Sequence, residues 1–102
     1  MATRIEENRD ESRYEVYVDD QLAGFTEYKL DGPQIALLHT EIDDAFEGQG
    51  LGKILAESIL DSARDAGLTV LPYCPFIASY IKRTTEYLDL VPEDRREEFD
   101  LA

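Results

Sequence analysis

The residues from Phe46 to Lys53 have the types and spacing of a loop that binds an anion. They read Phe-Glu-Gly-Gln-Gly-Leu-Gly-Lys, so glycine occupies every second position from 48 to 52. Glycines leave backbone N–H groups unobstructed by Cβ atoms, and a helix that begins there adds partial positive charge. The pattern predicts a site for a phosphate or pyrophosphate, to which Lys53 can add a full charge.

The glycine spacing by itself leaves an alternative open. It matches neither the Walker A loop nor the Gly-x-Gly-x-x-Gly loop that holds dinucleotides. A flexible loop that merely precedes a helix explains the three glycines equally well. The elements around the loop have to decide between the two interpretations.

The spacing of apolar residues predicts a helix directly after the glycines, over about residues 50–66. Gly67 lies where a left-handed C-terminal cap is expected. The residues that recur at the spacing of one helical face are Leu51, Ile54, Leu55, Ile59 and Ala63.

A second helix is predicted from Pro75, because proline suits the first turn of a helix. Cys74, the single cysteine, then lies at the N-cap, where the start of the helix favours a reactive thiolate. The alternative is a small buried side chain, since free cysteines are among the most buried residues. The apolar stripe of this helix consists of Phe76, Ile77, Tyr80 and Ile81.

Alternating or continuous apolar runs predict three or four antiparallel strands before the glycine loop, the first of them weak, and one further strand after the first helix. On the fourth strand, His39 and Glu41 share one face while Thr40 and Ile42 share the other. The strand–helix–strand order at the end favours parallel pairing of the last two strands. The predicted strands are a weak one before residue 8, then 14–18, 21–30, 34–42 and 68–71.

Together these elements predict an α+β fold. Antiparallel N-terminal strands come first, the glycine loop then leads into the main helix, and a parallel fifth strand and a second C-terminal helix follow. The compact domain is expected to span residues 1–92. The mostly charged residues 93–102 are expected to form an acidic tail that is frayed or weakly helical.

The composition limits the classes of molecule that this protein is expected to bind. The 102 residues suffice for one domain, and a net charge of −13 disfavours binding to nucleic acids and anionic membranes. One cysteine permits no intramolecular disulfide, no apolar run is long enough for a membrane span, and the acidic N-terminus is unlike a signal peptide. A cytoplasmic protein is therefore expected. One histidine and one cysteine give no zinc-ligand spacing, so no metal is expected.

The order of elements over residues 5–91 resembles that of the GNAT superfamily of acetyl-CoA-dependent N-acetyltransferases, and its small single-domain branch in particular. Gly50 and Gly52 match the loop of the superfamily, whereas Glu47 stands where Arg or Gln is usual. A carboxylate at that position would lie near the bound pyrophosphate unless it points away or pairs with a base.

Three further motifs are similar to those of the small branch, and linked motifs in one order are more specific than the glycines alone. The branch usually has His-Pro before its Glu-Tyr pair, whereas this chain has Thr84-Thr85. The motifs are His39-Thr40-Glu41 at the end of the fourth strand, Pro72-x-Cys74-Pro75-Phe76 after the fifth, and Glu86-Tyr87 after the second helix.

The resemblance implies an α/β sandwich of GNAT type that binds acetyl-CoA. It implies that the pyrophosphate lies on the loop Gly48–Lys53, that pantetheine follows the open edge of the fourth strand, and that the thioester lies near Cys74. The residues that it implies in cofactor contact are Thr40, Ile42, Glu47, Gly48, Gln49, Gly50, Leu51, Gly52, Lys53, Cys74, Phe76 and Tyr80.

Acetyl transfer to an amine needs a deprotonated nucleophile, a donor to the developing oxyanion and an acid for the leaving thiolate. Under the resemblance, Cys74 is the candidate for a covalent acetyl relay or for a thiol beside the thioester. His39 or Glu41 is the candidate base. Tyr80 and Tyr87 are candidate donors to the thiolate, with a core position as the alternative.

The expected function is transfer of an acetyl group from acetyl-CoA to an amine, by a monomer or weak homodimer. Two alternatives stay open. One is a CoA or acyl-CoA binding module without turnover, which the departure at Glu47 favours. The other is a protein-interaction module whose loop binds nothing. The acceptor can be a polyamine, a lysine side chain, a protein N-terminus or a small amine.

Overall fold

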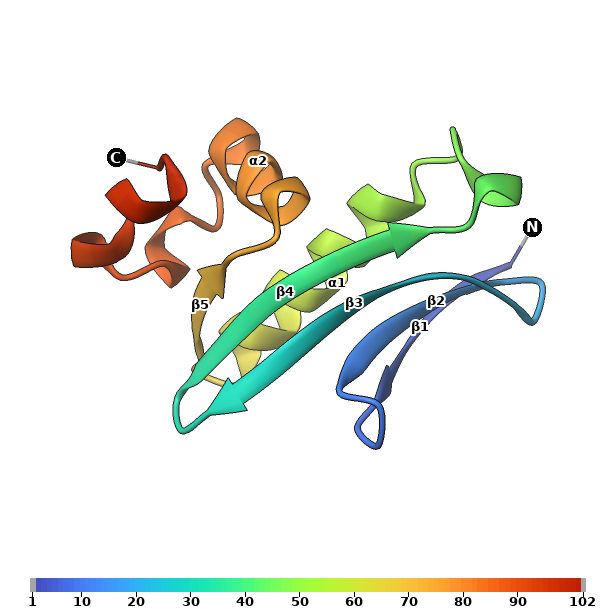
Figure 1. Ribbon diagram of the computed structural model, residues 1–102, viewed down its shortest axis with the longest axis horizontal. Helices are drawn as coiled ribbons and strands as arrows, with labels where there is room; N and C mark the ends of the chain where they lie inside the picture. The colour runs from blue at the N-terminus through green and yellow to red at the C-terminus, as the bar shows by residue number, and fades with distance from the viewer. Residues whose placement is uncertain (1, 102) are drawn as a thin grey trace.

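The computed structural model describes residues 2–101 and confirms the predicted α+β fold, with two helices and a five-stranded sheet (Figure 1). Short 3₁₀ turns complete the chain at Asp44–Phe46, Leu88–Leu90, Glu93–Arg95 and Glu97–Phe99. The helices are α1 (Leu51–Asp65) and α2 (Pro75–Thr84). The strands are β1 (Thr3–Asn8), β2 (Arg13–Val18), β3 (Gln21–Asp31), β4 (Gln34–Ile42) and β5 (Thr69–Pro72).

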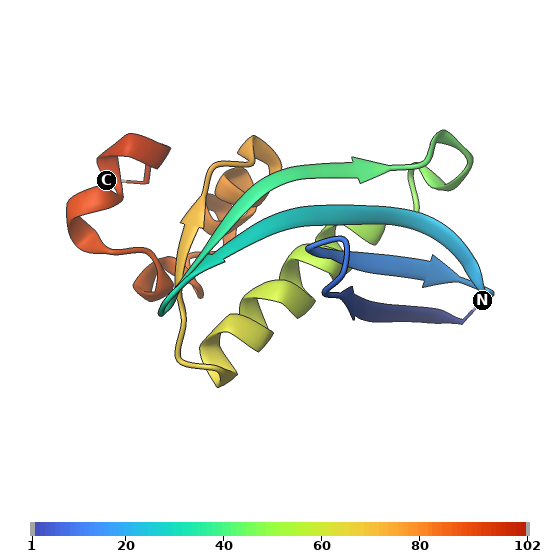
Figure 2. The same ribbon diagram turned by 60° about the horizontal axis from the view of Figure 1, so that its bottom comes forward.

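The strands form one sheet in the order β1-β2-β3-β4-β5. The first four are antiparallel neighbours, and β5 pairs in parallel with β4, as the strand–helix–strand order predicts. α1 makes the connection between them and lies along one face of the curved sheet (Figure 2). We call this face of the sheet inner and the opposite face outer.

α1 packs on the inner face through a broader stripe than the spacing of its large apolar residues indicated. The placement of Ile54 on that stripe is wrong, because its side chain is 39% exposed. Ala56 and Leu60 are buried instead, which turns the centre of the buried stripe away from Ile54. Gly67 takes the predicted left-handed conformation, with φ of 71°. The buried residues of α1 are Leu51, Leu55, Ala56, Ile59, Leu60 and Ala63.

A β-bulge interrupts β4 in its middle. Tyr28 of β3 pairs with Leu37, but the preceding residue, Glu27, pairs with His39, so Leu38 is an extra residue on β4. The bulge keeps Leu37 buried on the inner face and returns the even-numbered residues that follow to that same face. His39 therefore lies on the outer face, beside the exposed Leu38.

The C-terminal segment, residues 93–101, forms two short 3₁₀ turns, which agrees with the predicted weak helicity, and it packs on the domain. Phe99 and Leu101 are each only 9% exposed, and the Phe99 ring meets the Tyr73 ring edge to face at 5.1 Å between centroids. The guanidinium of Arg96 donates to the main-chain oxygens of Val91 and Leu88, at 3.1 and 3.0 Å. These contacts fasten the segment to the domain.

We expect the Phe99→Ala substitution to lower the free energy of unfolding by about 3 kcal/mol, because it removes a buried ring from the contact with Tyr73. Urea denaturation followed by circular dichroism would measure the change. Leu30→Ala is the control, since Leu30 is 51% exposed and its truncation should cost about 0.5 kcal/mol or less. If the tail were frayed, the two substitutions would lower the free energy of unfolding by similar small amounts.

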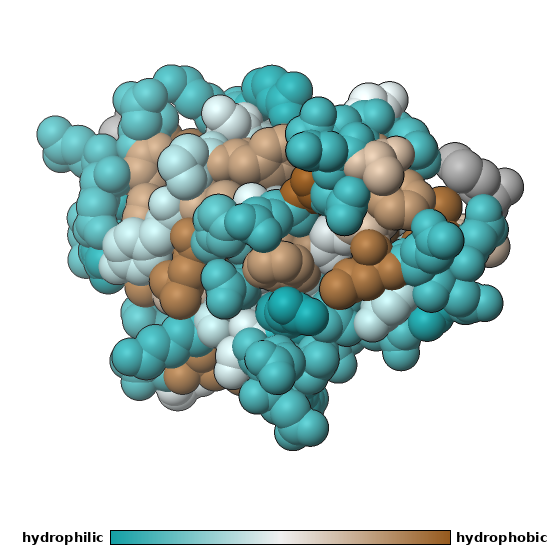
Figure 3. Space-filling view, turned by 45° about the vertical axis from the view of Figure 1, so that its right-hand side comes forward, coloured by the Kyte–Doolittle hydropathy of each residue, from teal (hydrophilic) through white to brown (hydrophobic). Residues whose placement is uncertain are grey.

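On the face seen in Figure 3, apolar patches are separated by hydrophilic side chains, in keeping with the net charge of −13. Within residues 2–101, no helix is long and apolar enough to cross a membrane. The large apolar side chains that are exposed are Leu22, Leu30, Leu38, Ile54, Tyr73 and Phe76.

Candidate functional site

The loop before α1 presents backbone N–H groups without protein acceptors. Gly48 and Gly50 have φ angles of 83° and 74°, in the left-handed region that favours glycine. The N–H of Ile54 donates to the C=O of Gly50 at 3.2 Å and is the first to do so in α1. Within residues 2–101, the N–H groups from Gly48 to Lys53 thus have no hydrogen-bond acceptor. Free donors of this kind at the start of a helix are the basis of anion sites.

The charged residues that flank the loop, Glu47 and Lys53, are both exposed. The N–H of Glu47 donates to the C=O of Asp44 at 3.4 Å, which closes the short turn before the loop. In the part of the chain that the structure describes, the Glu47 carboxylate has no basic partner within ion-pair distance. Its charge is therefore balanced by solvent alone and not by a neighbouring base.

Gly52 links the loop to α2 through a close approach. A Cβ atom at this position would lie 2.7 Å from the ring of Phe76, so the absence of a side chain lets the ring lie against the first turn of α1. Phe76 stays 40% exposed, which corrects its placement with the buried stripe of α2. The ring therefore forms part of the surface beside the loop.

β4 and β5 separate after a short ladder. Their parallel pairing begins at Gln34 with Thr69 and ends at Leu37 with Pro72. Beyond that point, the N–H of Cys74 donates to the C=O of Leu37 at 2.8 Å, and the chain turns into α2. The edge of β4 over residues 38–42 is therefore left without a neighbouring strand on the β5 side, within the described residues.

Cys74 lies at the point where the two strands separate. It is the N-cap residue of α2, followed by Pro75, as the sequence predicts. Its side chain is not a helix cap: the residue is 3% exposed, and the thiol donates to Oγ1 of Thr40 at 3.2 Å. Oγ1 of Thr40 is in turn 2.9 Å from Oγ1 of Thr26 on β3. The sulfur is thus the end of a chain of polar atoms on the inner face.

His39 and Glu41 form a second pair, on the outer face. Nε2 of His39 is 3.2 Å from Oε1 of Glu41, and both side chains are more than half exposed. The Phe25 ring of β3 lies edge-on to the imidazole, with centroids 6.4 Å apart. This arrangement confirms that residues 39 and 41 share a face.

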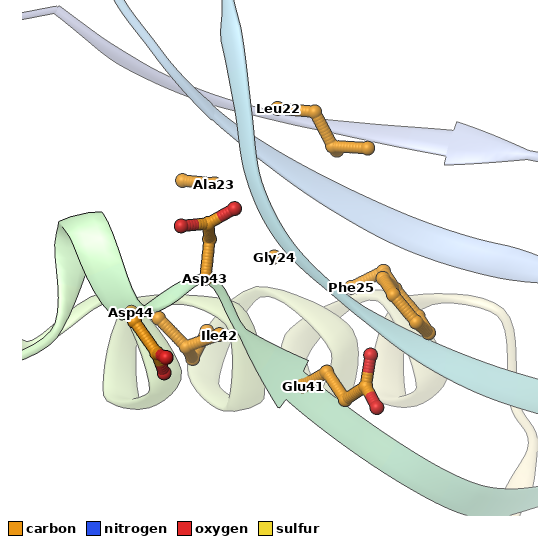
Figure 4. A pocket seen from close by; sticks show the side chains of 8 residues that line it. All are labelled: Leu22, Ala23, Gly24, Phe25, Glu41, Ile42, Asp43 and Asp44. Atoms are coloured by element: carbon orange, nitrogen blue, oxygen red, sulfur yellow. The ribbon is translucent and has the colours of Figure 1, made fainter.

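A hollow of about 510 Å³ adjoins this pair at the end of β4. Figure 4 shows the side chains of Phe25 and Glu41 extending from neighbouring strands at one side of it. The other carboxylates of its lining belong to Asp43 and Asp44. The hollow thus places carboxylates beside an aromatic ring and next to His39.

Tyr80 and Tyr87 both join the C-terminal part of the chain to α1. The hydroxyl of Tyr80 donates to Glu57 at 3.3 Å, and that of Tyr87 donates to Asp61 at 2.8 Å. Burial, together with these carboxylates, raises the pKa of both phenols, so both stay protonated at neutral pH. The rings stack at 6.2 Å and are buried. Their contacts are those of core residues, and the cofactor contact predicted for Tyr80 stays a prediction.

The structure therefore brings the predicted residues together in three groups. The glycine loop and Phe76 form one, Cys74 and Thr40 a second, and His39 and Glu41 a third. Thr26 was not predicted from the sequence as a site residue, because its position opposite Thr40 depends on the bulge. Within residues 2–101, no cluster of three or more His, Cys, Asp or Glu side chains suits a metal ion.

Comparison with known proteins gives consistent matches. The sequence model of a family described as GCN5-related N-acetyl-transferase matches residues 13–90. Protein NATD1 of Mus musculus is 32% identical over 92 residues, which cover 84% of this chain and 82% of the mouse protein. Protein NATD1 of Xenopus tropicalis is 30% identical over 93 residues, which cover 86% of this chain and 84% of the Xenopus protein.

Solved structures share the fold at lower identity. A GCN5-like protein from Staphylococcus aureus superposes with a TM-score of 0.68 at 23% identity, covering 87% of both chains. A ribosomal-protein-alanine N-acetyltransferase from Brucella melitensis gives 0.56 at 21% identity, over 86% of this chain and 57% of that one. N-acetylglutamate synthase from Neisseria gonorrhoeae, complexed with coenzyme A and N-acetyl-glutamate, superposes with a TM-score of 0.50 at 19% identity. The match covers 87% of this chain and 22% of the synthase.

Proposed function

Because the chain belongs to the GCN5-related N-acetyltransferase family, we propose that it transfers an acetyl group from acetyl-CoA to an amine. The observation that carries the proposal furthest is the set of unpaired N–H groups from Gly48 to Lys53, at the start of α1. A pyrophosphate is the ligand that such donors suit, and CoA contains one.

The loop supports a binding mode for the cofactor. The CoA pyrophosphate accepts hydrogen bonds from the backbone of Gly48–Lys53, and the exposed ammonium of Lys53 adds charge. The exposed ring of Phe76, held against Gly52, offers an apolar surface beside it. A structural neighbour, the synthase from Neisseria gonorrhoeae, has coenzyme A bound, which agrees with this choice of ligand.

The separation of β4 from β5 supports the path of pantetheine. Its amides pair with the unpaired edge of β4, in the manner of an added strand. The thioester then lies near Cys74, where the two strands part. Thr40 and Ile42 of β4 line this path.

In a direct transfer, a neutral amine attacks the thioester carbonyl of acetyl-CoA. The new C–N bond forms, the C–S bond breaks, and CoA leaves as a thiolate that takes up a proton. A base has to remove the proton of the amine, and the His39–Glu41 pair is the candidate on the outer side of β4. The carboxylates of the adjoining hollow favour a cationic amine near that base.

We expect His39→Gln or Glu41→Gln, whichever removes the base, to lower kcat about 100-fold or more. The variant should also lose the fall in rate toward low pH, because that fall reports protonation of the base. A pH–rate profile with saturating acetyl-CoA would measure both effects. Glu27→Gln is the control, since Glu27 is an exposed carboxylate opposite His39 on the same face. Equal profiles for all three variants and the wild type would exclude both residues as the base.

A CoA-binding module without turnover is the second candidate, and the unpaired carboxylate of Glu47 beside the loop favours it. Isothermal titration with CoA separates both candidates from a chain that binds no cofactor. Single-turnover loss of acetyl-CoA in the presence of a panel of amines then separates the two. Binding without loss of acetyl-CoA for any amine would establish the module and reject the enzyme.

A further inference from the structure

Three polar atoms, two of them in buried residues and the third in the partly buried Thr40, form a hydrogen-bonded chain that the proposed transfer does not explain. Oγ1 of Thr26 on β3, Oγ1 of Thr40 on β4 and Sγ of Cys74 at the start of α2 are joined by contacts of 2.9 and 3.2 Å. Thr26 is 0% exposed and Cys74 is 3% exposed. The part of the chain that the structure describes supplies no further hydrogen-bond partner to these three atoms.

The number of hydrogens on these three atoms depends on whether the sulfur carries a proton. With a protonated thiol, three hydrogens share two contacts, so one hydrogen has no acceptor among the three atoms. With a sulfur that carries no proton, two hydrogens serve two contacts: Thr26 donates to Thr40, and Thr40 donates to the sulfur. Either threonine can be the donor in the bond between them, so the direction of the hydrogen bonds along the three atoms can reverse. Only in this second state does every hydrogen of the three atoms have an acceptor among them, and a donor without an acceptor is unfavourable at a buried residue such as Thr26.

We infer that Thr40, backed by Thr26, is a positioning residue that prepares Cys74 to act as a nucleophile and to carry an acyl group. The hydroxyl accepts from the thiol at rest and turns to donate to the sulfur once the proton has left. The same two hydrogens match a sulfur bonded to an acyl carbon, which also carries no proton. The inference rests on the proposed function for the identity of its acyl donor, a thioester of CoA.

The step balances without any further reagent. The sulfur of Cys74 attacks the carbonyl carbon of acetyl-CoA, a new S–C bond forms, and the bond between that carbon and the CoA sulfur breaks. The proton that Cys74 has lost is the one that the departing CoA thiolate takes up. The amine then attacks the acetyl-cysteine, and the sulfur returns to its initial state when it regains a proton.

Alkylation of the chain without cofactor by iodoacetamide tests the inference, because the thiolate is the species that reacts. Thr40→Val removes the hydroxyl at nearly constant shape and should slow alkylation at neutral pH about 10-fold or more. Its pH profile should move to higher pH, which a loss of packing alone would not produce. Thr40→Ser keeps the hydroxyl and should restore the wild-type rate and profile.

Two further variants complete the test. Thr84→Val is the matched control, since Oγ1 of Thr84 is buried without a partner within the described residues, and its alkylation should equal that of the wild type. Should Thr40→Val fail to fold in a thermal scan, Thr26→Val carries the test. It leaves Thr40 in place but removes the donor behind it, so it should give a smaller shift in the same direction.

The outcomes separate this inference from the proposed function. A rate and a pH profile that do not change between wild type, Thr40→Val and Thr26→Val would overturn the positioning role, whatever the enzyme does. Dependence on Thr40 in a chain that never consumes acetyl-CoA would support the positioning role and reject the acetyltransferase. Consumption of acetyl-CoA without dependence on Thr40 would reject the positioning role alone.

Discussion

Gly50→Asp is expected to weaken CoA binding about 10- to 100-fold relative to Gly50→Asn, because a carboxylate a few ångströms from the pyrophosphate repels it. Both side chains tolerate the left-handed backbone at this position, where φ is 74°. A Cβ atom at position 50 meets nothing within 4 Å, so neither substitution disturbs packing. The two variants therefore differ in charge and hardly at all in shape.

Isothermal titration with CoA at low and at high salt would measure this effect. The difference between the variants should shrink as salt rises, because the repulsion is screened over about 10 Å at 0.1 M. Gly32→Asp provides a control with the same change in net charge, at another exposed glycine of positive φ with open space around it. If Gly50→Asp and Gly50→Asn bound CoA equally well, the pyrophosphate would have to lie elsewhere.

Cys74→Ala is expected to lower kcat for acetyl transfer about 100-fold or more while leaving the affinity for CoA within about threefold. The side chain ends where β4 and β5 separate, so its loss removes the proposed nucleophile without touching the glycine loop. Steady-state kinetics with an amine acceptor, together with titration of CoA, would measure the two quantities. The split between them is the signature of a group that acts in the reaction and not in binding.

Cys74→Ser separates chemistry from packing in this test. Serine nearly preserves the volume of the buried thiol, but its hydroxyl is a poor nucleophile at neutral pH. If Cys74 carries the acetyl group, both variants lose activity together. Full activity of the alanine variant would show that the amine attacks the thioester directly, with Cys74 as a packing residue.

Much of the fold was predictable because its signals are local. The glycines before α1, Pro75 at the start of α2 and the alternation along β2 each depend on neighbouring residues. The wrong predictions concern residues whose burial depends on contacts with parts of the chain distant in sequence. Phe99 and Leu101 are two apolar residues in an acidic stretch, and only their contact with the domain tells them from a solvated tail.

The candidate site was predictable in its parts but not in its connections. The positions of Cys74 at an N-cap and of His39 beside Glu41 follow from sequence spacing. The link from Cys74 through Thr40 to Thr26 does not, because the bulge at Leu38 sets the register of β3 against β4. Likewise, no spacing rule places the ring of Phe76 against Gly52, since that contact depends on how the two helices meet.

The turn that ends β5 after Pro72 has a consequence for how the proposed cofactor enters. The amide of Tyr73 is the next one that would face β4, but it donates to the C=O of Leu71 at 3.0 Å. The N–H of Cys74 donates to the C=O of Leu37 at 2.8 Å, so the ladder ends there. The separation of the two strands is therefore fixed by hydrogen bonds within the chain itself. Association should accordingly involve little backbone rearrangement and a small ordering penalty, and the encounter rate should be governed by diffusion and charge instead of by a slow opening step.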